Sequence, residues 1–268
     1  MRRLSQYIPH CLQGHIRSLR NLLRYGSSDF FTFVSIEIST YCNRRCWYCP
    51  NAQSDRGSVE NKKFLPDAVF YKVIDELASY RFNGFVSPNL YGEPLLDERL
   101  IPFVRYTREK LPFAAIIIFT NGDFLTVEYY QRLVKTGVSN FWITQHSDEV
   151  SENVRGVLEY RNTHGDNGVH LIFEKLAVIR NRGGLIENGI PLKPNECRLM
   201  MPEVSIDYRG NVVLCCHDYY GSVVFGNVAS EKLLDIWKKP QFRQLRKKMK
   251  KGIVELPICK KCTGRFGR

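Results

Sequence analysis

Five runs of apolar residues alternate along the chain with segments whose apolar residues recur every three or four positions. The apolar runs are predicted strands at 33–39, 84–89, 115–119, 139–145 and 169–174. The segments between them are predicted helices at 67–80, 97–110, 127–136 and 152–161. This alternation is typical of a parallel sheet flanked by helices. We expect an α/β fold with a partial (β/α) TIM-like barrel of about five to six parallel strands, since a full eightfold barrel usually needs about 250 residues by itself.

The pattern changes near residue 190, after Gly183, Gly184 and Gly189. A hairpin-like pair follows at 203–208 and 211–215, and a helical stretch at 231–249 is interrupted at Pro240. The sequence therefore predicts two units: a barrel over 1–190 and a small C-terminal α+β module over 191–268.

Composition and charge narrow the class of protein. The 268 residues are 44% hydrophobic and 25% charged, which excludes a wholly disordered chain. No stretch approaches the roughly 20 apolar residues that span a bilayer, and a secretory signal is missing, so we expect a cytoplasmic protein without a membrane partner.

Residues 238–268 hold twelve Lys or Arg and one acid, Glu255, and so contribute +11 of the net +12. Such a tail can bind nucleic acid, but the helical spacing of its apolar residues favours a solvated helix face and no nucleic-acid partner.

Nine cysteines, an odd and clustered number, favour metal ligation over disulfides in a chain without an export signal. Cys42, Cys46 and Cys49 form a C-x3-C-x2-C motif directly after the first predicted strand. Three thiolates on one loop can hold three irons of a 4Fe-4S cluster and leave the fourth iron open to a ligand. Zinc is the alternative, although zinc sites prefer paired C-x2-C spacing.

A second set of cysteines lies in the C-terminal region, at Cys197, Cys215, Cys259 and Cys262. Four thiolates with one C-x2-C pair suit a fully ligated iron–sulfur cluster and a structural zinc ion equally well. The spacing alone leaves both open.

The first motif, with Tyr48 just before Cys49, resembles the signature of the radical S-adenosylmethionine (SAM) superfamily. The resemblance implies that the open iron binds SAM, and that one electron cleaves SAM to a 5'-deoxyadenosyl radical, which removes a hydrogen atom from the substrate. It also implies an external electron donor of the flavodoxin or ferredoxin type.

Other residues fit this resemblance at the ends of the predicted strands. Gly92 and Glu93 resemble the glycine-glutamate motif that receives the amino group of SAM, although Tyr91 stands where a second glycine is common. Further cofactor contacts are implied at Thr120, Asn121, Thr144 and Ser147, with turn or strand caps as the alternative. For His146 we expect a structural role.

The C-terminal region resembles the auxiliary-cluster extension of this family in its short, twitch-type form of the SPASM domain. The matching segments are Gly210-x4-Cys215-Cys216-x-Asp218 and Cys259-x2-Cys262. The resemblance implies a second 4Fe-4S cluster held by Cys197, Cys215, Cys259 and Cys262. Cys216 is then either a buried thiol or, in an epimerase, a hydrogen donor.

A saturated auxiliary cluster can accept an electron from a substrate radical, which makes the chain resemble the aminocyclitol dehydrogenases of the family. We therefore expect an oxidoreductase that acts on a small polyhydroxylated or amino-sugar substrate. A peptide-modifying enzyme or epimerase using Cys216 is the alternative, and a zinc-bearing nucleic-acid module is another. Arg180, His217 and Asp218 are expected between the clusters, where they steer or accept the hydroxyl proton; ion pairing at the surface and hairpin capping are the competing roles.

Overall fold

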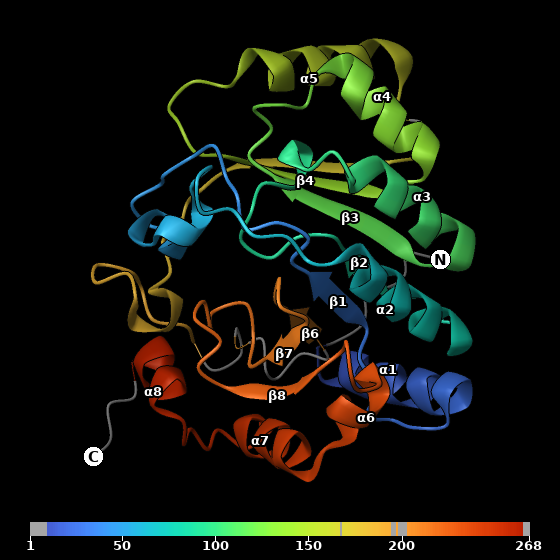
Figure 1. The fold of residues 1–268 in the computed structure, drawn as a ribbon, viewed down its shortest axis with the longest axis vertical. Coiled ribbons are helices and arrows are strands. Elements are labelled where there is room, and N and C mark those ends of the chain that lie inside the picture. Colours follow the sequence, from blue (N-terminus) through green and yellow to red (C-terminus); the bar gives the residue numbers. More distant parts are fainter. Residues whose placement is uncertain (1–9, 167, 194–196, 198–202, 265–268) are drawn as a thin grey trace.

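One mixed sheet runs through the molecule, and its eight described strands follow the order β5-β4-β3-β2-β1-β6-β7-β8 (Figure 1). The computed structural model describes residues 10–166, 168–193, 197 and 203–264. The strands are β1 Phe33–Ile36, β2 Phe85–Ser87, β3 Ala115–Thr120, β4 Asn140–Gln145, β5 His170–Lys175, β6 Glu203–Ile206, β7 Asn211–Val213 and β8 Val224–Asn227. The helices are α1 His10–Tyr25, α2 Asp67–Ser79, α3 Leu100–Lys110, α4 Val127–Thr136, α5 Glu152–His164, α6 Leu233–Lys238, α7 Pro240–Lys250 and α8 Pro257–Thr263.

The expected partial barrel with parallel strands is confirmed. Strands β1 to β5 pair in parallel with their sequence neighbours. Strand β6, the first strand of the predicted hairpin, pairs in parallel with β1 and is the sixth parallel strand. Strands β7 and β8 then continue the same sheet in antiparallel pairing. The segment that carries the second cysteine set is therefore joined to the barrel through backbone hydrogen bonds.

The helices of the barrel begin and end at local signals. Helix α4 starts after Thr126, whose side chain accepts from the Tyr129 N–H, and it ends at Gly137, whose φ of 119° is accessible mainly to glycine. Helix α3 starts three residues later than predicted because the Asp97 carboxylate accepts from the backbone N–H of Arg99 and holds a turn there. Helices α2 to α5 follow one another along one side of the sheet (Figure 1).

Helices α6 and α7 form the predicted C-terminal helical stretch, with the break at Pro240. Trp237 and Phe242 are buried, and their rings meet at 5.1 Å between centroids. Trp237 also packs on Phe31, just before β1, at 5.6 Å. This apolar contact attaches the basic C-terminal helices to the barrel. Among the described residues no helix combines the length and apolarity that a membrane crossing requires.

Candidate active site

The first cysteine motif lies on the loop that follows β1, at the end of the barrel where the parallel strands terminate. The Cys42 N–H donates to the Gly57 carbonyl at 3.2 Å and the Cys49 N–H donates to the Cys46 carbonyl at 2.9 Å. All three thiols line one cavity of about 240 Å³. Its other walls come from the ends of the neighbouring strands, as expected for a barrel site.

A buried arginine fixes the far end of this loop. The Arg56 guanidinium forms an ion pair with Glu37 at 2.6 Å and donates to the Tyr219 carbonyl at 2.7 Å. It also lies over the rings of Tyr91, Tyr208 and Tyr219, at 5.3, 5.2 and 4.1 Å from their centroids. Burial raises the pKa of Glu37 to about 7, and the charge of Arg56 acts in the opposite direction. Arg56 thus connects the cluster loop to the C-terminal segment, and sequence reasoning missed it.

The Gly92-Glu93 pair packs directly against the cluster loop. A Cβ at Gly92 would come within 2.1 Å of the Ser39 carbonyl oxygen, so only glycine allows this approach. The Glu93 carboxylate is buried and accepts hydrogen bonds from Thr120 Oγ1 at 2.6 Å and the Asn121 N–H at 2.9 Å. Burial raises the pKa of Glu93 to about 7, and these hydrogen bonds oppose the rise. A buried carboxylate at the cavity wall is suited to receive an ammonium group.

An aromatic side chain of the motif is held in place by a histidine. The Tyr48 hydroxyl and His146 Nδ1 share a hydrogen bond of 2.7 Å, and the two rings stack at 5.9 Å. Burial lowers the pKa of His146, and the nearby Arg44 lowers it further, which favours the neutral ring. The structural role expected for His146 therefore has a specific partner.

The two residues near the end of β4 that were expected to contact the cofactor differ in position. Thr144 lines the cavity. Ser147 is exposed, donates to the Glu149 carbonyl and is absent from the described lining.

The segment after β5 connects the cavity with the second cysteine set. Arg182 lines the cavity, in a left-handed conformation with φ of 46°. Burial raises the pKa of both Cys49 and Cys262, and the charge of Arg182 opposes the rise at both thiols. The next residue, Gly183, hydrogen-bonds the Cys262 thiol through its backbone N–H. Arg182 is thus positioned between the two sets, while Arg180 donates to the Pro191 carbonyl and is not among the described lining residues.

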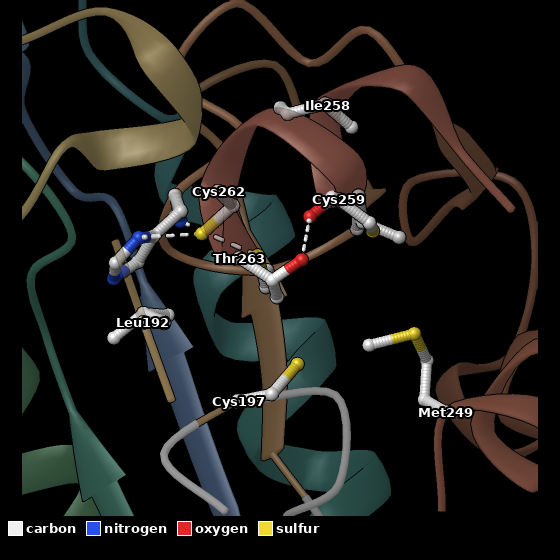
Figure 2. A pocket seen from close by; sticks show the side chains of 10 residues that line it. Leu192, Cys197, Met249, Ile258, Cys259, Cys262 and Thr263 are labelled. Carbon is white, nitrogen blue, oxygen red and sulfur yellow. Dashed lines mark hydrogen bonds between the residues drawn. The ribbon is translucent and has the colours of Figure 1, made fainter. Parts of the chain in front are cut away.

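Four cysteines surround the second cavity, as the spacing predicted. Cys259 and Cys262 lie one turn apart on α8, and Cys197 lines the same cavity (Figure 2). Cys215, which follows β7, is the fourth cysteine of the lining. The remaining wall is largely apolar and includes Leu192, Leu214, Met249 and Ile258. The His217 side chain shares a 3.5 Å contact between its Nδ1 and the Cys262 sulfur. His217 therefore belongs to the auxiliary site rather than to the first cavity.

Two other residues near Cys215 have roles in the backbone turn. The Asp218 carboxylate is buried and accepts from the N–H groups of Ser222 and Val223 and from the Ser222 hydroxyl. Cys216 is not among the described residues of either cavity lining. Its carbonyl accepts a 2.5 Å hydrogen bond from the Tyr91 hydroxyl. Tyr91, which departs from the family motif, thereby links the first cavity to the turn that bears Cys215.

The donor sets fit iron–sulfur clusters. The eight cysteines with described side chains, Cys216 included, form no disulfide. Within the described ranges, no three His, Cys, Asp or Glu side chains are close enough to share one metal ion. Burial raises the pKa of Cys42 and of Cys259 to about 12, so both thiols hold protons that a bound cluster displaces.

This combination of barrel, open three-cysteine loop and second cysteine set defines a class of protein, and the chain belongs to the radical SAM superfamily. The sequence profile of that superfamily matches residues 36–197. The profile of the SPASM iron–sulfur cluster-binding domain matches residues 197–263. The expected cofactors, two iron–sulfur clusters and SAM, are thereby confirmed.

Individual members of the superfamily are also similar to this chain in sequence and in structure. The S-adenosyl-L-methionine-dependent 2-deoxy-scyllo-inosamine dehydrogenase of Niallia circulans is 34% identical over 236 residues, which are 87% of this chain and 93% of that enzyme. The crystal structure of BtrN in complex with AdoMet and 2-DOIA aligns with a TM-score of 0.76 at 33% identity, over 86% of this chain and 92% of that one. BtrN in an open conformation aligns with a TM-score of 0.62 at 29% identity, over 83% and 87%.

The chain is thus a radical SAM enzyme whose residues have separate tasks. When bound, the first cluster and SAM supply a radical that removes a hydrogen atom from the substrate. Cys42, Cys46 and Cys49 would hold that cluster, and the other four cysteines would hold the auxiliary cluster. Glu93 would offer an acceptor to the cofactor's ammonium group, and Arg182 would offer a cation at the cavity wall.

Proposed function

We propose that the protein dehydrogenates a small aminocyclitol, oxidising a secondary alcohol to a ketone. The observation that carries this proposal is the 34% identity to 2-deoxy-scyllo-inosamine dehydrogenase over nearly the full length of that enzyme. The structural match to BtrN with 2-DOIA supports the same substrate class. A cavity of about 240 Å³, shared with the cofactor, also suits a small substrate better than a folded peptide.

The arrangement of the two cysteine sets supports oxidation. Removal of a hydrogen atom from the carbinol carbon leaves one proton and one electron to be lost before a ketone forms. The auxiliary site is next to the cavity, separated from it by Asn181–Gly184, and is suited to accept that electron. Arg182 at the cavity wall is suited to orient the hydroxyl oxygen, a role that we transfer to it from Arg180, because Arg182 is the one that lines the cavity.

The remaining sequence expectations adjust this proposal. His217 contacts the Cys262 sulfur, which supports a role in tuning the auxiliary site, and Asp218 has the contacts of a hairpin cap.

We propose a flavodoxin or ferredoxin as the electron donor to the first cluster. We also assign the enzyme to the cytoplasm, where thiols such as its eight described free cysteines stay reduced.

Anaerobic turnover tests the proposal. Reconstituted enzyme is incubated with SAM, dithionite and 2-deoxy-scyllo-inosamine, and 5'-deoxyadenosine and the ketone are followed by mass spectrometry. We expect the two products in equal amounts, with deuterium moving from the substrate carbon into 5'-deoxyadenosine. A panel of unrelated peptides serves as the comparison. Turnover of a peptide together with inertness toward every aminocyclitol would falsify the proposed substrate class.

Cys216 distinguishes dehydrogenation from epimerisation. An epimerase returns a hydrogen atom to its substrate, and Cys216 is the unassigned cysteine beside the auxiliary set. A dehydrogenase needs no such donor, so Cys216→Ala should keep at least half of the turnover and no solvent deuterium should enter the product. Loss of turnover with deuterium incorporation in the unaltered enzyme would favour the epimerase.

A further inference from the structure

Helices α7 and α8, with the residue that ends α7, carry a group of lysines, here called the basic face: Lys247, Lys250, Lys251 and Lys261, which are exposed, and Lys260, which is half-buried. Helix α7 buries Phe242, Leu245, Arg246 and Met249. Because residues three and four positions apart share a helix face, Lys247 and Lys250 lie together on the opposite, exposed side. Lys251 caps the helix and is exposed as well.

Within the part of the chain that the structure describes, the charge of the basic face is not neutralised by ion pairs. Other cations of the same region have acidic partners: Lys239 pairs with Glu231 at 2.5 Å, Lys248 with Glu255 at 2.8 Å, and Arg246 with Asp29 at 2.9 Å. By contrast, the lysines of the basic face form no ion pair with any described residue. Five like charges on α7 and α8, which both line the auxiliary cavity, create a positive field that extends beyond the surface.

The basic face is the outer side of the wall around the auxiliary cavity. Met249 of α7 and Ile258 of α8 line that cavity from within (Figure 2). Lys260 and Lys261 stand between the two α8 thiols in sequence. Cys259 and Cys262 are themselves buried, and Lys260 and Lys261 lie within one helical turn of both thiols on the same short helix.

We propose that the basic face docks an acidic one-electron carrier of the flavodoxin or ferredoxin type, in its oxidised form. The proposal rests on the proposed function, which leaves one electron at the auxiliary site. Oxidation of an alcohol to a ketone releases two electrons and two protons. Hydrogen-atom abstraction removes one of each, the second proton leaves to solvent, and the oxidised carrier gains the remaining electron.

The same positive face has nucleic acid as its competing partner. Both arginines of α7, Arg243 and Arg246, pair with Asp29, so the cations of α7 and α8 that have no ion pair with a described residue are lysines, which lack the forked guanidinium group that reads base edges. Phe242, the aromatic ring of α7, is buried and offers no stacking surface. Its position over the auxiliary site gives an electron carrier a reason to bind there and gives nucleic acid none. Electron-transfer complexes are small and electrostatically guided, which a group of exposed like charges supports.

Binding of oxidised flavodoxin to the anaerobically reconstituted holoenzyme tests the proposal by calorimetry. We expect affinity to fall about tenfold or more between 50 and 200 mM salt, and about tenfold at low salt in the triple variant Lys247→Glu, Lys250→Glu, Lys251→Glu. The matched control is Arg105→Glu, Arg132→Glu, Lys135→Glu on α3 and α4, with the same change in net charge. The control should bind within twofold of the unaltered enzyme.

The outcomes separate the two proposals. Equal losses in the triple variant and the control, or no binding by the unaltered enzyme, overturn docking at the basic face. Salt-dependent binding of a 20-nucleotide single strand that the triple variant alone loses, without flavodoxin binding, also overturns it in favour of nucleic acid. Since calorimetry needs no substrate, lysine-dependent flavodoxin binding without oxidation of any aminocyclitol supports docking and refutes the proposed substrate.

Discussion

Arg56 forms an ion pair, a backbone hydrogen bond and three ring contacts beside the active site, and its removal has a calculable cost. Arg56→Met keeps much of the length and the apolar packing but removes the charge. Glu37, whose side chain is fully buried, then loses its ion pair and keeps one weak donor, the Tyr208 N–H at 3.2 Å. Breaking a buried ion pair on one side costs about 3–5 kcal/mol. At about 2–4 °C per kcal/mol for a chain of this size, the melting temperature should fall by roughly 6–20 °C.

The stability that the Arg56→Met variant loses should depend on pH in a defined direction. Burial raises the pKa of Glu37 to about 7, and Arg56, which opposes the rise, is absent in the variant. A carboxyl group with a raised pKa binds more protons folded than unfolded, so its contribution to stability is retained at low pH and lost as pH rises through the folded pKa. We therefore expect Arg56→Met to be destabilised more at pH 8 than at pH 6, measured by anaerobic thermal unfolding of the holoenzyme.

A second variant isolates the uncompensated charge. Adding Glu37→Gln to Arg56→Met removes the buried carboxylate and should recover at least half of the lost stability at pH 8. The reasoning is refuted if Arg56→Met melts within about 3 °C of the unaltered enzyme, which is roughly 1 kcal/mol. It is also refuted if the loss is the same at both pH values.

Three further predictions concern the site itself. Glu93→Gln should weaken SAM binding roughly 10–150-fold, the equivalent of a charge-assisted hydrogen bond of about 1.5–3 kcal/mol, and in the unaltered holoenzyme the affinity should fall below pH 7 as Glu93 gains its proton; calorimetry at pH 6 and 7.5 measures both, and a flat profile would contradict the role of Glu93. Replacing Cys259 and Cys262 by Ala should lower the iron content from about eight atoms to about four, and should preserve SAM cleavage while ketone formation stops; loss of cleavage would mean that the first cluster depends on the second. Tyr91→Phe keeps the ring and loses one hydrogen bond to Cys216, so urea unfolding should show a loss of about 0.5–1.5 kcal/mol, and a loss above 3 kcal/mol would show that the hydroxyl has further partners.

Local signals made the barrel predictable from sequence. Helix α4 has the predicted bounds because Thr126 and Gly137 encode its start and end in single residues. The first cysteine set could also be recognised from sequence, since Cys42, Cys46 and Cys49 are residues of one type at short, recognisable spacings. In both cases the information lies within a few neighbouring residues.

Contacts between distant segments were not predictable in the same way. Arg56 and the Tyr219 carbonyl that it binds are 163 residues apart, and neither belongs to a motif. Arg182 rather than Arg180 lines the first cavity, and Arg182 has a left-handed backbone conformation. Hydrophobic patterning does not report such a conformation. The parallel pairing of β6 with β1 likewise depends on the whole sheet, because a hairpin signal specifies only its own two strands.

The pairing of β6 with β1 has a consequence for any shortened form of this enzyme. A chain ending before residue 203 would leave the backbone donors and acceptors of Phe33–Ile36 without a neighbour along one border of the barrel. Such an unprotected border is a template for association with other chains. Strand β6 therefore also protects this border of the barrel, and deleting the C-terminal segment should yield aggregates rather than a barrel with a single cluster.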